Sequence, residues 1–380
     1  MSTNHAEERA ALTASLYDAG ELTDPHLIDA FKGVPRAAFL PAFFVPTPDG
    51  RWRAIDSSSA EYLPMVYADT TLTTQLDGKV DPDPAAEPRK GLGTSSSTQP
   101  GLMASMLEAL SLTGGERVLE IGTGTGYNAA LLCHRLGDRQ VTSVEVDQQV
   151  TDVARDRLRG LGYLPTVVTG DGAAGWPDRA PYDRVIATAS FPTIPRAWVE
   201  QTVDGGLIVA SLWRDLGGGP LVRLIVQGGQ ARGHFLAQFG GFMPTREVTM
   251  TADALSTALG QKGVTRPTRL RGDVLTHPHA GLWIALRVCG VTWTGFTPDG
   301  GHEQLWLFAP DGSWAVVEDA AGTVEQYGTR NLWDEVESVH QQWTDVDQPN
   351  RERMGLTVTR NGAHEFWLDD PANIQWRDPA

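Results

Sequence analysis

The sequence predicts an α/β protein built on a doubly wound, mostly parallel sheet. Between about residues 94 and 246, short apolar runs alternate with helical patterns, as they do in proteins of this class. The apolar run at 118–121 leads directly into glycines at alternate positions. A second run, at 141–144, ends at Glu145, where doubly wound sheets place an acid that binds ribose hydroxyls. Together these observations indicate a sheet with a nucleotide-like ligand at its carboxyl edge.

The first part of the chain, residues 1–93, is predicted to be a helical cap followed by a loop region. Leucines are spaced among polar residues over 6–31, which is consistent with one or two amphipathic helices that cover another part of the protein. These leucines are Leu12, Leu16, Leu22 and Leu27. Residues 78–93 are too rich in proline, glycine and charge for regular structure. They are interpreted as a solvated linker or as a lid over a site, and we favour the linker.

Residues 94–246 supply the predicted seven-stranded sheet and its helices. A helix over 100–112 is expected because Pro100 suits a first turn and apolar residues recur on one face. Another helix follows from about Asn128. The expected strands are 118–121, 141–144, 165–169, 183–187, 206–211, 221–226 and 233–239. The last two are expected to form an antiparallel pair through Gly228-Gly229.

The last part, residues 247–380, reads as a folded α+β domain, and we expect it to recognise a peptide substrate. Pro310-Asp311-Gly312 and Asn361-Gly362 each lie between apolar runs, which is typical of hairpins. One helical face is expected to carry Leu332, Val336, Val339 and Trp343. Eight of the 12 tryptophans lie in this part, at 283, 293, 306, 314, 333, 343, 367 and 376. Most of them are expected to stabilise the domain core.

Composition limits the class of protein. The 380 residues are 41% apolar, so the chain can bury a large core in two or three domains. No apolar stretch is long enough to cross a bilayer and the first residues lack the order of a signal peptide, so we expect a cytoplasmic protein without a membrane partner. A net charge of −16 opposes nucleic-acid binding. Cys133 and Cys289 are too few for a metal cluster, and no metal site is expected.

The spacing of glycines in the turn distinguishes between two kinds of nucleotide site. A dinucleotide fold has the spacing G-x-G-x-x-G, whereas Gly122, Gly124 and Gly126 follow G-x-G-x-G. Glu120 lies two residues before the first glycine, where it would repel a pyrophosphate but suits a cationic or zwitterionic ligand. With Glu145 after the next strand, this pattern resembles motif I of class I S-adenosylmethionine methyltransferases. The resemblance implies their Rossmann-like fold and seven-stranded sheet.

Four further segments resemble the protein L-isoaspartyl O-methyltransferase family. They are Val34-Pro35-Arg36 with Phe39-Leu40-Pro41, Ser97-Thr98-Gln99-Pro100, Asp171-Gly172 with the Ala180–Ile186 run, and Ala187-Thr188-Ala189-Ser190 continuing to Pro195. Their order and spacing cover roughly residues 10–246. In the serine position of the family's I-S-Q-P segment this chain has Thr98, after the unusual run Ser95-Ser96-Ser97.

The resemblance implies S-adenosylmethionine as cofactor, with S-adenosylhomocysteine as product, and assigns residues to it. Glu120 and the backbone of Gly122, Gly124 and Gly126 are expected at the methionine portion, Glu145 at the ribose, and Asp171 with Gly172 at the adenine edge. Thr123, Tyr127, Asn128 and Val146 complete the predicted cofactor residues.

The same resemblance places the acceptor carboxylate near Thr98, with Ser97 as a second candidate to orient it. A helix cap before Pro100 is the alternative role for Thr98. Ser96, Gln99, Thr188, Ala189 and Ser190 are expected on the substrate side. Because a carboxylate has a pKa of about 3.9, it is already ionised at neutral pH, so we expect hydrogen-bond donors and no catalytic base.

A narrower resemblance concerns the substrate. The passage 330–337, the 95–100 segment and the ending 367–371 resemble methyltransferases encoded with ATP-grasp peptide maturases. This implies methylation of an aspartate in a cyclised precursor peptide, a graspetide, followed by closure to an aspartimide. A repair enzyme for isoaspartyl proteins is the alternative, and a noncatalytic peptide-binding module is a third possibility.

Overall fold

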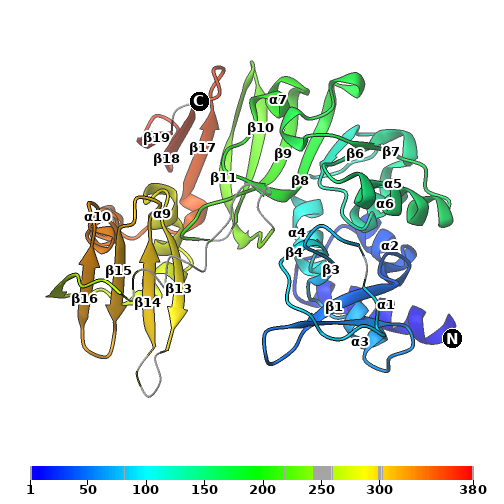
Figure 1. Cartoon of the computed structure of the whole chain (residues 1–380). Coiled ribbons are helices and arrows are strands. Elements are labelled where there is room, and N and C mark those ends of the chain that lie inside the picture. The colour runs from blue at the N-terminus through cyan, green and yellow to red at the C-terminus, as the bar shows by residue number, and fades with distance from the viewer. Residues whose placement is uncertain are drawn as a thin grey trace.

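The computed structural model describes residues 2–80, 82–217, 219–242, 258, 260–297, 301 and 303–378 (Figure 1). Its central element is a ten-stranded sheet in the order β19-β18-β17-β11-β10-β9-β8-β5-β6-β7. The parallel strands are β5 (Val118–Ile121), β6 (Val141–Glu145), β7 (Thr166–Thr169), β8 (Tyr182–Phe191) and β9 (Thr202–Leu212). The antiparallel strands β10 (Pro220–Gln227) and β11 (Gln230–Phe239) follow through the turn at Gly228 and Gly229. Every strand predicted over 118–239 is present, and the strands β8 to β11 are longer than predicted.

The sheet is wider than the seven strands predicted. The structure adds β17 (Met354–Val358), β18 (His364–Leu368) and β19 (Ile374–Asp378). β17 pairs antiparallel with β11, so these strands continue the central sheet (Figure 1). The sequence pattern places them in a C-terminal domain, because a local hairpin signal does not reveal which free strand edge the hairpin will join. The predicted boundary between residues 246 and 247 lies outside the described residues.

Both faces of the parallel strands are buried, as a doubly wound sheet requires. Side chains alternate along β5: Val118 packs in one apolar cluster, and Leu119 and Ile121 pack in the other. The longer helices that contribute most to the first cluster are α1 (Ser2–Asp18), α2 (Pro25–Gly33), α4 (Pro100–Ala109) and α5 (Tyr127–Leu136), and further helices add single side chains such as Leu158. Helices of the second are α7 (Arg196–Glu200), α9 (Ala280–Arg287) and α10 (Leu332–Asp345). The sheet therefore carries one core on each face.

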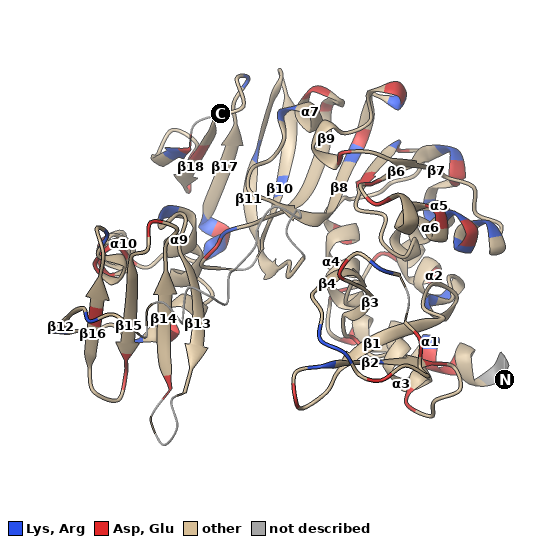
Figure 2. Ribbon diagram, in the orientation of Figure 1, with Lys and Arg blue, Asp and Glu red and all other residues tan. Residues whose placement is uncertain are grey.

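The helix α6 (Gln148–Gly160) shows how the charged residues are distributed. It carries acidic and basic residues close together (Figure 2). Arg155 pairs with Asp152 at 2.9 Å, and Arg159 pairs with Asp156 at 3.0 Å. Its buried side bears Val150, Ala154 and Leu158. The outer side is therefore a solvated mixed-charge surface, which is not the basic stripe that a phosphate backbone would require.

The cap contains a small sheet that the sequence did not predict. Its four strands lie in the order β2-β1-β3-β4. They are β1 (Ala42–Pro46), β2 (Trp52–Asp56), β3 (Leu72–Leu76) and β4 (Gly93–Ser97), with the short helix α3 (Tyr62–Val66) between β2 and β3. The predicted amphipathic segment forms α1 and α2, and all four of its leucines are buried. Strands of five residues among prolines and aromatics give too little alternation to be recognised.

The proline-rich segment 78–93 joins β3 to β4 inside this cap sheet. Its described residues turn back against β2, where Arg89 and Trp52 form a β-bridge and Trp52 Nε1 donates to the carbonyl of Gly91 at 3.0 Å. Only Gly93 belongs to a strand. The segment therefore connects neighbouring strands of one sheet and is not a linker between domains.

Arg36 holds the cap together from inside. Its side chain is completely buried in the turn Arg36–Phe39. The guanidinium donates to a ring of backbone carbonyls, and its hydrogen bonds join the cap to the start of α4. The acceptors are Val66 at 2.8 Å, Ala68 at 3.1 Å, Thr70 at 3.0 Å, Ser97 at 3.4 Å and Thr98 at 3.1 Å. Burial lowers the pKa of Arg36 to about 10, so the side chain is still cationic at neutral pH.

The C-terminal region contributes a second, five-stranded sheet in the order β12-β16-β15-β14-β13. The strands are β12 (Val264–Pro267), β13 (Thr292–Phe296), β14 (Gln304–Phe308), β15 (Trp314–Glu318) and β16 (Thr323–Tyr327). Both predicted hairpins form, as β14–β15 and β17–β18, and the predicted face of α10 is buried. Trp283, Trp306, Trp314, Trp333, Trp343 and Trp367 are buried, and Trp293 and Trp376 are half-buried. These tryptophans thus stabilise the core, as expected.

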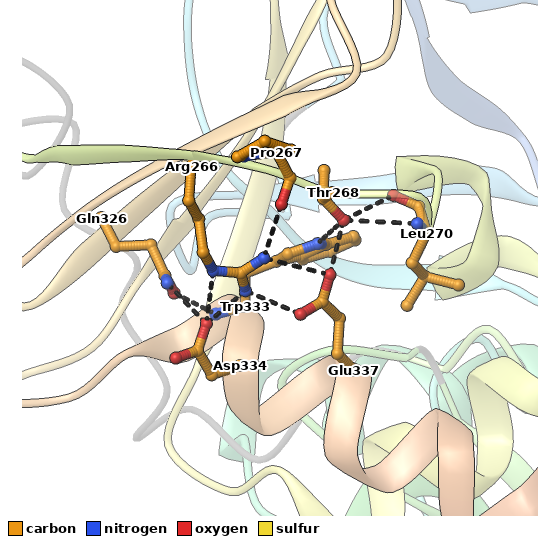
Figure 3. A network of polar contacts seen from close by, with 8 residues as sticks. All are labelled: Arg266, Pro267, Thr268, Leu270, Gln326, Trp333, Asp334 and Glu337. Carbon is orange, nitrogen blue, oxygen red and sulfur yellow. Dashed lines mark hydrogen bonds and ion pairs between the residues drawn. The ribbon is translucent and has the colours of Figure 1, made fainter.

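A polar network fastens β12 and β16 to the start of α10 (Figure 3). Arg266 donates to Asp334 Oδ1 at 3.0 Å and to the carboxylate of Glu337 at 2.7 Å. Gln326 Nε2 also donates to Asp334 Oδ1, at 2.8 Å. On the same helix, Trp333 Nε1 donates to Thr268 Oγ1 at 3.0 Å. Side chains of the passage 330–337 therefore form hydrogen bonds within the C-terminal region itself.

Replacing Arg36 with Met is expected to lower the free energy of unfolding by about 3 kcal/mol or more, because buried carbonyls would lose their donors. Urea unfolding followed by circular dichroism measures this change. The exposed Arg159, changed to Met in the same way, is the control and should alter stability by less than about 0.5 kcal/mol. An R36M protein as stable as the control would contradict the role given to Arg36.

Candidate functional site

A cavity of about 650 Å³ lies at the carboxyl ends of the central parallel strands. Its walls come from the ends of β5, β6 and β8 on one side and from β4 of the cap on the other. This is the edge of a doubly wound sheet where ligands bind. The volume is in the range of sites for small organic ligands.

The glycine loop after β5 is tightly enclosed. Gly122 has a φ of +93°, and a Cβ there would lie 2.9 Å from Thr188 Oγ1, which donates to the Gly122 carbonyl at 2.6 Å. At Gly124, φ is +52° and a Cβ would lie 3.3 Å from the carbonyl oxygen of Ser96. Glycine is therefore required both for the backbone conformation and for the close approach of β4.

Glu145 and Asp171 are the charged side chains that line this cavity in the described chain. Glu145 ends β6, and its Oε2 accepts from the Gly124 N–H at 3.0 Å while Oε1 accepts from the Asp147 N–H at 3.2 Å. Asp171 Oδ1 accepts from the Ala173 N–H at 2.9 Å. Both carboxylates are thus oriented by backbone donors beside the cavity. Their assignment to the ribose and the adenine edge remains a prediction from the sequence.

Glu120 does not line the cavity, although the sequence assigns it to the methionine portion of the cofactor. Its side chain is completely buried below the glycine loop, where it accepts from Asn128 Nδ2 at 2.7 Å and from Ser143 Oγ. Burial raises the pKa of Glu120 to about 7. Ser143 Oγ also lies 2.6 Å from Thr123 Oγ1. Glu120 faces the opposite side of β5 from Ile121, which lines the cavity. Its carboxylate therefore supports the loop and Asn128 from below.

The cap side of the cavity is formed by β4 and the residue after it, and all of these residues except Gly93 carry a hydroxyl group. Its residues are Thr94, Ser95, Ser96, Ser97 and Thr98, and all of them line the cavity. Arg36 Nε and Nη2 both lie 3.4 Å from Ser97 Oγ as donors. The hydroxyl hydrogen of Ser97 must then be donated to another group. We call residues 94–98 the acceptor wall.

The structure separates the predicted residues into those that line the cavity and those that do not. Lining residues among the predictions are Thr98, Ser97, Ser96, Gly122, Thr123, Gly124, Tyr127, Asn128, Glu145, Val146, Asp171, Gly172, Thr188 and Ala189. Thr98 does not cap α4, whose first turn follows Gln99 without a side-chain cap. The alternative role of Thr98 as a helix cap is therefore not found.

Three other predicted residues do not line the cavity. The Gln99 amide donates to Asp69 Oδ2 at 2.8 Å. Ser190 is buried, with its Oγ 2.8 Å from Ser211 Oγ. A Cβ on Gly126 would lie 3.4 Å from Ala154 in α6, so this glycine serves the packing of the loop on that helix. For Ser190, which lies in β8, the reason is strand geometry, since neighbouring residues face opposite sides. Gln99 lies after β4, at the start of α4, where its side chain turns to Asp69.

Several lining residues were missed from the sequence. They are Thr94, Ser95, Met103, Ile121, Thr125, Val144, Val150, Ala173, Phe191, Pro192, Thr193, Pro195 and Phe242. Thr94 and Ser95 continue the serine run, and recognising that run as a strand would have included them. Phe242 follows β11 and carries no local signal, because only the folded chain brings it to the cavity.

The lining contains no lysine, arginine or histidine among the described residues. It therefore offers hydroxyls, backbone groups and two carboxylates, but within the described chain no amine or imidazole that could act as a base beside the acceptor wall. In the described parts of the chain, no group of histidines, cysteines and acids is arranged to hold a metal ion. Within the same parts, no helix is long and apolar enough to span a bilayer.

A glycine loop and an ordered acid after the second strand, at the carboxyl edge of this sheet, define a class I S-adenosylmethionine-dependent methyltransferase. Comparison with known proteins specifies the family. A family model described as protein-L-isoaspartate(D-aspartate) O-methyltransferase matches residues 59–215. The chain is 34% identical over 253 residues to the protein-L-isoaspartate O-methyltransferase of Methylorubrum extorquens, covering 66% of this chain and 93% of the relative. The chain belongs to the protein-L-isoaspartate O-methyltransferase family.

Two further relatives give the extent of the likeness. Protein-L-isoaspartate O-methyltransferase 1 of Rhodopseudomonas palustris is 34% identical over 224 residues, which are 59% of this chain and 76% of the relative. A solved structure of a protein-L-isoaspartate O-methyltransferase aligns with a TM-score of 0.53 and 23% identity, covering 95% of this chain and 100% of that one. The similarity in fold thus includes the C-terminal region. The predicted enzyme class and cofactor are confirmed by the family.

Changing Glu145 to Gln is expected to raise the Kd for S-adenosylhomocysteine roughly tenfold to a hundredfold, because a hydrogen bond to a charged group contributes about 1.5–3 kcal/mol. Isothermal titration calorimetry measures the change. Glu200, which is exposed and pairs with Arg196, provides the matched control E200Q, which should bind as the wild type does. Equal affinity of E145Q and E200Q would remove Glu145 from the cofactor site.

Proposed function

We propose that the protein transfers a methyl group from S-adenosylmethionine to a carboxylate that derives from an aspartyl residue of a peptide. The observation that carries this proposal is the cavity itself, with oriented carboxylates on one side and the acceptor wall of hydroxyls on the other. Family membership supports the same reaction. The glycines and Glu145 of the cofactor side are intact, which argues against a noncatalytic peptide-binding module.

The residues present fit the cofactor. Gly122 and Gly124 leave room for close backbone approach, and Glu145 presents a carboxylate for hydroxyl donors. Asp171 would serve the adenine edge, with Gly172 beside it. When bound, S-adenosylmethionine would supply an electrophilic methyl group, and S-adenosylhomocysteine would remain as product. Glu120 would act on this site only through Asn128 and the loop.

The chain's own contribution to the reaction is orientation. An acceptor carboxylate is ionised at neutral pH and needs no proton removed before it reacts. Thr98 and Ser97 would donate hydrogen bonds to it, and Ser97 is free to donate because Arg36 occupies its oxygen. Thr188 and Ala189 would limit the opposite side of the acceptor. Holding reacting groups in line can supply roughly 7–11 kcal/mol of the rate enhancement.

Isoaspartyl residues of proteins are the substrate that the relatives favour. The family description and the relatives all carry this activity in their names. The C-terminal region does not argue against it, because the likeness to a solved isoaspartate methyltransferase extends through that region. On this proposal the protein methylates the free carboxylate of a rearranged aspartyl residue.

A cyclised precursor peptide is the second candidate substrate, and the acceptor wall favours it. The serine run Ser95-Ser96-Ser97 belongs to the resemblance with graspetide methyltransferases, and it lines the cavity. The passage 330–337 supports this candidate less, because its side chains are engaged within the C-terminal region (Figure 3). On this proposal the methyl ester is displaced by a neighbouring backbone amide, with loss of methanol, to give an aspartimide.

Intact mass spectrometry of two peptides incubated with the protein and S-adenosylmethionine distinguishes the candidates. One is a generic isoaspartyl peptide with its normal aspartyl twin as control. The other is an ATP-grasp-cyclised precursor from the same gene neighbourhood. Gain of one methyl group on the isoaspartyl peptide alone is the expected result for a repair enzyme. Methylation of the cyclised peptide alone, followed by net loss of water relative to the starting peptide, would assign the second substrate. Methylation of neither would contradict the proposed function.

A further inference from the structure

The two sides of the cavity are joined behind it by hydrogen bonds that pass through Gln75. Glu145 on the cofactor side and Thr94 on the acceptor wall both line the cavity. Gln75 and Asp147 do not line it. They connect the two sides from outside the space that ligands would occupy, so any effect they have on binding must pass through the residues they hold.

Gln75 lies on β3 with its side chain completely buried. Its Oε1 accepts from Thr94 Oγ1 at 2.8 Å, and its Nε2 donates to Asp147 Oδ2 at 3.1 Å. Thr94 Oγ1 in turn accepts from the Gly78 N–H at 2.9 Å, so its own hydrogen goes to Gln75. Because Asp147 can only accept, the orientation of the Gln75 amide is fixed at both ends.

The chain of bonds continues from Asp147 to the glycine loop. Asp147 Oδ1 caps α6 by accepting from the Gln149 N–H at 2.8 Å. The Asp147 N–H donates to Glu145 Oε1 at 3.2 Å, and Glu145 Oε2 accepts from the Gly124 N–H at 3.0 Å. Glu145 is therefore connected to Gln75 through the backbone N–H and the side chain of Asp147.

The backbone pairing of the acceptor wall is irregular at the same place. Gln75 is opposite Ser95, and the register between β3 and β4 shifts on both sides of it, between Thr73 and Gln75 and between Gln75 and Leu76. Such irregularities disrupt the ladder locally. The position of Thr94 and Ser95 therefore depends more on the Gln75 side chain than it would in a regular pair of strands.

We propose that Gln75 couples the cofactor side to the acceptor wall, so that the cofactor and the peptide carboxylate bind cooperatively. Ribose hydroxyls would donate to the remaining lone pairs of Glu145 and draw its carboxylate toward the ligand, and Gln75 would carry the resulting shift to Thr94. This inference rests on the proposed function, since it takes Glu145 as the ribose ligand. By thermodynamic linkage, the peptide must increase cofactor affinity by the same factor as the cofactor increases peptide affinity.

The test is the Kd of an acceptor peptide with and without saturating S-adenosylhomocysteine, measured on the full chain by fluorescence anisotropy. The acceptor is whichever of the isoaspartyl and cyclised peptides the wild-type protein methylates. The wild type is expected to bind it at least about fivefold more tightly when the cofactor product is present. In Gln75→Met, which keeps the volume but removes both hydrogen bonds, this ratio should fall below about twofold. Affinity for S-adenosylhomocysteine alone should stay near the wild-type value.

Two variants make the result specific. Asp147→Asn, with its amide nitrogen toward Gln75, breaks the same connection from the other end and should also lower the ratio. Gln140→Met removes an amide bond to the Gly115 carbonyl at the opposite end of the sheet and should leave the ratio unchanged. A wild-type ratio near one, or an undiminished ratio in Q75M, would overturn the coupling while methyl transfer still stands. If the wild type methylates neither peptide, the proposed function is contradicted, and this inference falls with it.

Discussion

The buried guanidinium of Arg36 is the interaction on which the acceptor side of the cavity depends. It joins the loop that follows α3 to the end of β4 through carbonyls, and it reaches Ser97 Oγ as a donor. A guanidinium group can donate hydrogen bonds but cannot accept them, so the surrounding backbone must point its carbonyl groups inward. This arrangement fixes the end of the acceptor wall and leaves the hydroxyl hydrogen of Ser97 available. The cap is therefore part of the site as well as a cover for the sheet.

The cofactor half of the site could be predicted from the sequence, whereas the acceptor half could be predicted only in part. Gly122, Gly124 and Glu145 follow from strand ends and glycine spacing, which are local properties of a parallel sheet. Glu120 was expected at the cofactor but is buried and does not line the cavity, because spacing does not tell whether a strand residue faces the cavity or the core. The acceptor wall depends on pairing of β4 with β3 across a long connection, and no local pattern contains that pairing.

The C-terminal region shows the same limit on a larger scale. Its hairpins and the buried face of α10 were evident from turn residues and apolar spacing. The pairing of β17 with β11 was not evident, because the sequence of a hairpin does not show which open sheet edge the hairpin will join. The network around Arg266 explains why the passage 330–337 is rich in acids: Asp334 and Glu337 share one guanidinium (Figure 3). A motif that suggested substrate recognition thus has a structural role, and the serine run remains the part that faces the cavity.

The central claim is that this protein methylates an already ionised carboxylate by orienting it, without a base. The lining offers hydroxyls and no lysine, arginine or histidine among the described residues. The most direct measurement is kcat for methyl transfer as a function of pH, with cofactor and peptide both saturating so that only groups of the bound complex contribute. The account predicts a kcat that is nearly constant from about pH 6 to pH 8.5, well above the pKa of the acceptor. A kcat that rises about tenfold per pH unit toward a plateau would reveal a general base and would contradict the account.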